Sequence, residues 1–162
     1  MGNLLFGLTF ASALGSGLIA GIFFAFSTFV MTALSRLPAE QGIVAMQSIN
    51  STILSTLFSF VFMGTALACV VLAIVSYKKL GTPSAAYLLA ASLLYFVGSF
   101  LVTVIFNVPL NDTLAAVAPN SAAGAQQWTH YLSSWVAWNH VRTIASLASL
   151  AFFIVALRKW GN

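Results

Sequence analysis

The side chains best suited to acid–base and charge-stabilising chemistry lie close together in the stretch from Trp128 to Arg142. His140 is a candidate general base, because a neutral imidazole accepts a proton near physiological pH. Arg142 carries a permanent charge that can stabilise an oxyanion or an enolate. Polar groups in lipid usually face a protein interior or a water-filled cavity, because an unpartnered polar group there costs free energy. The stretch therefore predicts a pocket built around these two residues.

Two asparagines shortly before this stretch can support the same chemistry. Asn107 and Asn111 flank Pro109, and their amides can donate hydrogen bonds to a developing anion. We group Asn107 with His140 and Arg142 as the candidate catalytic residues. Structural roles remain open for several of them: His140 can bridge helices, Arg142 can anchor the chain to lipid headgroups, and Asn111 can cap a helix.

Aromatic residues in the same stretch recur every three or four positions, so that they share one helix face with Arg142. Trp128 and Tyr131 equally suit an aromatic belt at a membrane surface. Trp135 and Trp138 are better placed to form the walls of a pocket for a flat aromatic ligand. The candidate substrate-binding residues are Trp135, Trp138, Asn139, Asn111 and Asn50.

The chain offers few groups for other classes of catalysis. Its two carboxylates, Glu40 and Asp112, are too few for a carboxylate-bridged di-iron site or for paired-carboxylate hydrolysis. A metal site made of His130, His140 and Asp112 is disfavoured, because the histidines are about 15 Å apart along one helix; His130 is expected at the surface. No phosphate loop, CxxC pair or dinucleotide fingerprint occurs. We predict no metal and no cofactor, with a metal- or haem-bearing subunit as the less favoured alternative.

The composition places the chain in a lipid bilayer. Of its 162 residues, 60% are hydrophobic and only 5% are charged, whereas soluble domains carry about 25% charged residues. The net charge of +4 comes from few and scattered basic residues, which argues against binding to nucleic acid. The single cysteine, Cys69, lies in an apolar stretch and is expected to be structural. The length suits one domain covering residues 1–162.

Four long apolar stretches predict an all-α fold, a four-helix transmembrane bundle. The expected spans are Leu4–Leu34, Thr52–Ser76, Ser84–Phe106 and Ala125–Leu157. A short extra helix begins near Pro38 and either stands alone or continues into the second span. Pro109 is expected to end the third helix.

Small residues and basic residues indicate packing and orientation. Gly17, Gly21 and Ala25 form a row suited to close helix packing, within the bundle or in a homo-oligomer. The positive-inside rule makes the sides carrying 78–79 and 158–159 cytoplasmic, so both termini are expected inside, in the plasma (inner) membrane. Polar groups from all four spans then gather at the outer end, around one outward-opening pocket: Arg36, Asn50, Asn107, Asn111, Trp128, Asn139, His140 and Arg142.

Several motifs resemble the anthrone oxygenase-like family of small membrane proteins. They are FFAFSTFVM (23–31), RLP (36–38), GIVAMQSIN (42–50), NVPLN (107–111) and WNHVRT (138–143). The motifs follow the order of the family and extend over nearly the whole chain. The resemblance implies oxidation of an anthrone to an anthraquinone by molecular oxygen, without flavin or haem. The partner is then an apolar planar small molecule that can enter from the lipid.

This chemistry needs a base, a donor for an oxyanion and a dry flat pocket. An anthrone methylene is activated by two rings and a carbonyl, so loss of its proton gives a delocalised anion that reacts with oxygen directly. We assign the base to His140 and stabilisation of the anion to Arg142, Asn107 and Asn139. The alternative is a non-catalytic membrane protein that binds a quinone, a lipid or a partner helix in the same pocket.

Overall fold

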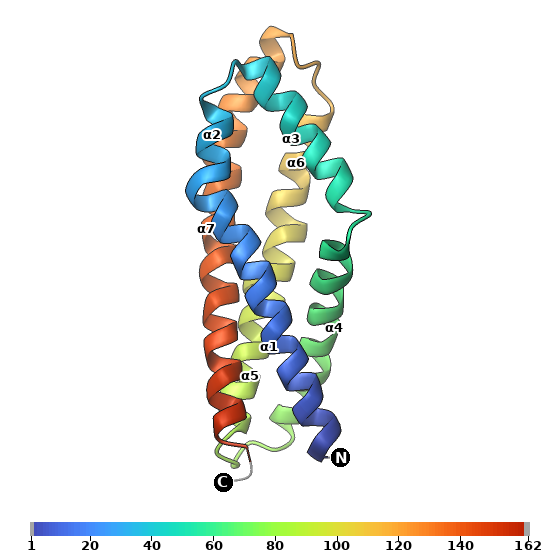
Figure 1. The fold of residues 1–162 in the computed structure, drawn as a ribbon, viewed down its shortest axis with the longest axis vertical. Coiled ribbons are helices and arrows are strands. Elements are labelled where there is room, and N and C mark those ends of the chain that lie inside the picture. The colour runs from blue at the N-terminus through green and yellow to red at the C-terminus, as the bar shows by residue number, and fades with distance from the viewer. Residues whose placement is uncertain (1, 161–162) are drawn as a thin grey trace.

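The computed structural model describes residues 2–160, and all of its regular elements in this range are helices (Figure 1). Four of them are long and apolar enough to cross a membrane, so the chain is an integral membrane protein and the predicted fold class is confirmed. These spans are Gly2–Ser35 (α1, η1 and α2), Leu57–Tyr77 (α4), Ala85–Ala115 (α5, η2, η3 and α6) and Ala122–Arg158 (α7).

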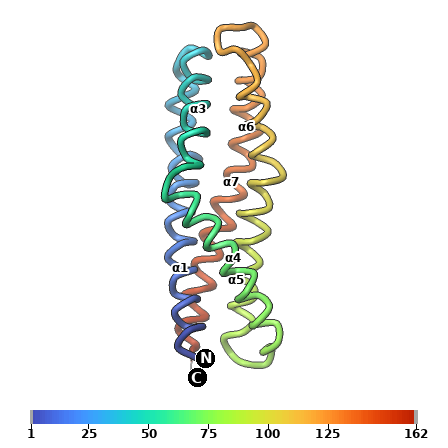
Figure 2. The backbone as a smooth tube through the Cα atoms, turned by 90° about the vertical axis from the view of Figure 1, so that its right-hand side faces the viewer, coloured from blue at the N-terminus to red at the C-terminus, as the bar shows by residue number. Residues whose placement is uncertain are grey.

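The extra helix, α3 (Ala39–Ile53), is a separate element and does not continue into α4. Three residues, 54–56, interrupt the helical path, with Thr56 in an extended conformation. Hydroxyls end α3: Ser55 Oγ donates to the Thr52 carbonyl at 3.0 Å and Thr56 Oγ1 donates to the Ile53 carbonyl at 2.8 Å. The break lets α3 diverge from α4 and lie at the end of the bundle opposite the start of α1 (Figures 1 and 2).

The expectation that Pro109 ends the third helix is wrong. Two wide π segments, Phe96–Leu101 (η2) and Thr103–Asn107 (η3), precede it, and α6 (Val108–Ala115) continues the span. The Val108 N–H bonds five residues back to the Thr103 carbonyl. Because Pro109 falls in the first turn of α6, its missing N–H does not break the chain's helical path. A similar π segment, Phe26–Val30 (η1), lies between α1 (Gly2–Ala25) and α2 (Met31–Ser35).

The last helix, α7, begins three residues earlier than expected, at Ala122. Ser121 caps it, because its Oγ accepts a hydrogen bond from the Gly124 N–H at 2.9 Å. The helix has 37 residues, or about 55 Å, whereas the 21 residues of α4 span about 31 Å, close to the hydrocarbon thickness of a bilayer. α7 therefore extends well beyond the depth that α4 defines.

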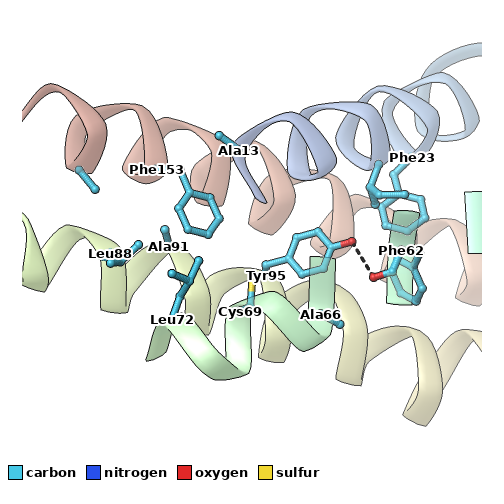
Figure 3. Packing of buried hydrophobic residues seen from close by; sticks show 12 residues of the cluster. Ala13, Phe23, Phe62, Ala66, Cys69, Leu72, Leu88, Ala91, Tyr95 and Phe153 are labelled. Carbon is cyan, nitrogen blue, oxygen red and sulfur yellow. Dashed lines mark hydrogen bonds between the residues drawn. The ribbon is translucent and has the colours of Figure 1, made fainter. Parts of the chain in front are cut away.

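Two clusters of buried apolar side chains hold the helices together. The first lies toward the end where α1 begins and α7 ends; there Tyr95 Oη donates to the Phe62 carbonyl at 3.3 Å (Figure 3). Cys69 is fully buried in this cluster, as expected of a structural thiol. The second cluster lies beneath α3 and comprises Met31, Ile43, Met46, Leu114, Trp128, Tyr131 and Trp135.

Close helix approach occurs at glycines other than the predicted row. A Cβ at Gly21 would meet nothing within 4 Å, and one at Gly17 would make ordinary contact with Leu150 at 3.4 Å. In contrast, a Cβ at Gly98 in η2 would lie 2.5 Å from the Cβ of Ala145 in α7. The backbones of the third span and α7 therefore meet at Gly98.

Candidate functional site

A cleft of about 620 Å³ opens where α3 diverges from α4, and α1, η1, the third span and α7 form its other walls. This volume is within the usual range for small-molecule sites. Aromatic side chains from several helices line it: Phe23, Phe26, Phe58, Phe62, Phe100 and Trp135. The polar lining consists of Gln47, Asn50, Ser51, Ser59, Thr103, Asn111, Asp112 and Arg142.

Arg142 supplies a buried cation to this cleft. Its side chain is only 4% exposed. Nη1 donates to Thr103 Oγ1 at 3.2 Å and Nη2 donates to Asn139 Oδ1 at 2.7 Å, while Nε has no partner. The guanidinium carbon lies 4.2 Å from the ring centroid of Phe23 and 5.0 Å from that of Trp135. All these partners are neutral, and a buried charge without a counter-charge is costly, so the cleft is electrostatically prepared for an anion.

Asn139, one turn before Arg142, fixes the position of the guanidinium. Its Nδ2 donates to the Phe23 carbonyl and to Ser27 Oγ, both at 2.7 Å. These bonds join α7 to α1 at the start of η1, and π segments of this kind are frequent at functional sites. They also turn Oδ1 toward Arg142, so the asparagine positions the cation without lining the cleft itself.

A hydrogen-bonded chain forms the rim of the cleft beneath α3. Asn50 Nδ2 donates to Tyr131 Oη at 3.4 Å, and Tyr131 Oη donates to Asn111 Oδ1 at 2.7 Å. Gln47 Nε2 donates to the Leu114 carbonyl at 2.9 Å. The chain connects α3, α7 and α6, so it holds the extra helix over the cleft.

The structure gathers most of the predicted site residues. Arg142, Trp135, Asn50 and Asn111 all line the cleft. Asn107 is buried behind it, where Nδ2 donates to the Trp135 carbonyl at 3.2 Å. Its role here is to hold the tryptophan-bearing turn of α7 against η3.

His140 and Trp138 lie outside the cleft. His140 is exposed on α7, because it is five residues from Trp135 and therefore points about 140° away around the helix. Trp138 stacks on Phe106 of η3, with ring centroids 3.7 Å apart. The three-four spacing placed Trp138 on the pocket face, but Asn139 occupies the inward position at that turn.

The sequence analysis overlooked several lining residues. Phe58 and Phe62 are spaced four apart at the start of α4 and stack at a centroid distance of 5.6 Å. Thr103 is one helical turn before Asn107, and this spacing is the signal that would have found it. Asp112 was considered only as a metal ligand, yet it is exposed and lines the cleft.

Within residues 2–160, no three His, Cys, Asp or Glu side chains come together in a group that could hold a metal ion. His130 is exposed and its Nδ1 lies 3.4 Å from Ser134 Oγ.

Comparison with known proteins bears on the family alone. Neither the curated proteins nor the solved structures include a match to this chain. The sequence model of the family described as anthrone oxygenase matches residues 56–152, which is more than half of the chain. This match includes α4, the third span and the part of α7 that carries Trp135, Asn139 and Arg142. The chain therefore belongs to the anthrone oxygenase family.

Proposed function

We propose that the cleft binds a flat polycyclic aromatic ketone of the anthrone type as its anion, and that the protein oxidises the activated methylene to a carbonyl with molecular oxygen. The observation that carries the proposal is Arg142, a buried guanidinium with neutral partners and a free Nε–H in an aromatic-lined cleft. Membership of the anthrone oxygenase family supports the same chemistry.

The aromatic walls suit the shape of such a ligand. Phe23 and Trp135 place their rings beside the guanidinium, and the stacked pair Phe58 and Phe62 lines another wall. Flat rings gain contact area and stacking energy against aromatic side chains. A planar anion would therefore have its rings against the walls and its oxygen at Arg142.

The reaction balances as R₂CH₂ + O₂ → R₂C=O + H₂O. The methylene first loses a proton, and its electron pair delocalises onto the ketone oxygen, where Arg142 stabilises the developing charge. The resulting anion passes one electron to oxygen, and the two radicals combine to form a C–O bond. After protonation, the O–O bond and the remaining C–H bond break, and water leaves. One oxygen atom is retained in the new carbonyl and the other leaves in water.

The position of Asp112 makes it the better candidate to accept the proton. Asp112 lines the cleft and is exposed, whereas His140 lies on another side of α7. Asp112 follows Thr103, a partner of Arg142, by nine residues, so the carboxylate lies roughly 14 Å along the helix from the cation's level. A substrate lying between them would have its oxyanion near Arg142 and release its proton toward the rim, directly or through water.

We expect Asp112→Asn to lower turnover by about 10²-fold, because a positioned base typically contributes at least this much. The paired control is His140→Ala, which should turn over at close to the wild-type rate. Initial rates of quinone formation, measured by absorbance with purified protein in lipid nanodiscs, check both variants. The reverse pattern, with His140→Ala inactive and Asp112→Asn active, would return the base role to the histidine.

Substrate can enter from the side of the bundle. Leu54, Met63, Val104 and Val108 line the cleft, yet they are 75%, 47%, 48% and 40% exposed. The opening between α4 and the third span is therefore rimmed by apolar side chains. Arg142 is 16 residues before Arg158, or about 24 Å along α7, which is within the depth that α4 spans. An apolar ligand would reach the cation from the lipid phase.

The decisive experiment follows oxygen atoms. The purified protein in nanodiscs is given an anthrone under ¹⁸O₂, and the quinone is analysed by mass spectrometry after a short reaction. We expect catalysed quinone formation with one ¹⁸O in the new carbonyl, at a rate well above that of empty nanodiscs. Binding of the ligand with no rate above the empty control would overturn the enzymatic proposal and favour a non-catalytic binding protein.

A further inference from the structure

A second cavity, of about 310 Å³, lies at the opposite end of the bundle from α3. The start of α1, the end of α4, the 78–84 connection, the start of α5 and the end of α7 surround it. Its polar lining is formed by Lys79, Lys159, Thr82, Ser84 and Ser76, and its apolar lining includes Leu5, Val75 and Leu88. The cavity thus combines two cations and hydroxyl groups with a greasy wall.

No side-chain carboxylate balances these two lysines. The chain has two such groups, Glu40 in α3 and Asp112 in α6, and both helices lie at the other end of the molecule (Figure 1). Lys159 Nζ is held over the ring of Tyr87 in α5, 5.5 Å from its centroid. Its positive charge is therefore directed across the end of the bundle toward the helix that also lines the cavity.

The start of α5 adds to the positive field. Ser84 is the N-cap of this 11-residue helix, and its side chain makes no capping hydrogen bond. Ser84 and Ala85 both line the cavity, so the first turn of the helix faces the same space as the lysines. The N-terminus of a helix carries a partial positive charge and uncapped N–H groups, which favour phosphate.

The level of the cavity identifies the source of the phosphate. It lies where α4 ends after crossing a bilayer-sized distance, which is the depth of lipid headgroups. We propose that this cavity binds a phosphate group, supplied by an anionic phospholipid whose acyl chain lies along Leu5, Val75 and Leu88. Basic pockets between membrane helices bind phospholipid headgroups in this way.

The chain offers a matched pair of double variants for the test. Lys79→Gln with Lys159→Gln removes the two lining charges, whereas Lys78→Gln with Arg158→Gln removes two adjacent charges that do not line the cavity. The purified full chain in detergent is titrated with phosphatidylglycerol, phosphatidylcholine or inorganic phosphate, and the unfolding midpoint is recorded. We expect phosphatidylglycerol to raise the midpoint of the wild type and of the control variant. Its apparent affinity should fall about 30-fold in the cavity variant.

Each other outcome decides the proposal. Equal stabilisation by phosphatidylcholine, or equal weakening in the control variant, would overturn it, because the effect would then come from the bilayer or from general charge. Absence of any stabilisation by phosphate or phosphatidylglycerol would also overturn it. Stabilisation by inorganic phosphate that matches the lipid and depends on Lys79 and Lys159 would support the phosphate site and assign it to the free ion.

Discussion

Replacing Arg142 with glutamine is expected to lower the rate of quinone formation by about 10²–10³-fold, the usual cost of losing one preorganised oxyanion donor. The same change should leave the unfolding midpoint unchanged or raise it. A cation buried at 4% exposure with only neutral partners opposes folding, so a neutral side chain of similar shape relieves that cost. Activity and stability therefore move in opposite directions, which a structural arginine would not produce.

Two further variants sharpen this test. Arg142→Lys keeps the charge but loses the planar group that contacts both Thr103 and Asn139, so an intermediate rate is expected. Arg36→Gln removes an exposed arginine that does not line the cleft and should have no effect. Rates and unfolding midpoints are measured on the same nanodisc preparations. A fully active Arg142→Gln protein would falsify the assignment of this residue to the anion.

Gly98→Leu is expected to disrupt the fold itself. A Cβ at this position would lie 2.5 Å from the Cβ of Ala145, and neither atom can rotate away because both are fixed to helix backbones. The third span and α7 would have to separate, at a cost of about 3 kcal/mol or more. The separation would also disturb the neighbouring contact of Arg142 with Thr103.

The matched control for this change is Gly64→Leu. A Cβ at Gly64 would meet nothing within 4 Å, and the residue is exposed on α4. Thermal unfolding in detergent, followed by circular dichroism, should show a large loss of stability for Gly98→Leu and almost none for Gly64→Leu. Equal midpoints for the two variants would mean that the helices do not meet at Gly98.

Hydropathy was sufficient to predict the number and class of the helices, because four apolar stretches of membrane length leave few other folds. It was not sufficient at Pro109. The π segments η2 and η3 change the hydrogen-bonding register just before the proline, and no simple sequence signal marks such turns. The break between α3 and α4 was likewise left open, because Ser55 and Thr56 are compatible with either a helix or a cap.

The candidate site was predictable in composition but not in rotation. The motif around residues 138–143 was correctly singled out, and its asparagine and arginine face inward. The histidine between them faces outward, because each residue turns the helix by about 100° and only part of a polar motif can face one cleft. Phe23 and Thr103 were overlooked because their contacts with Arg142 come from other helices, which spacing within α7 does not reveal.

The apolar rim at Met63 and Val104 has a consequence for how any ligand of this cleft must be counted. A site supplied through the side of the bundle samples molecules dissolved in the surrounding leaflet, so occupancy follows their mole fraction in lipid and not their concentration in the aqueous phase. The bilayer then acts as a reservoir that concentrates sparingly soluble compounds for the protein. Saturation would depend on the amount of lipid present, so rates for this family are comparable only at a stated ratio of ligand to lipid.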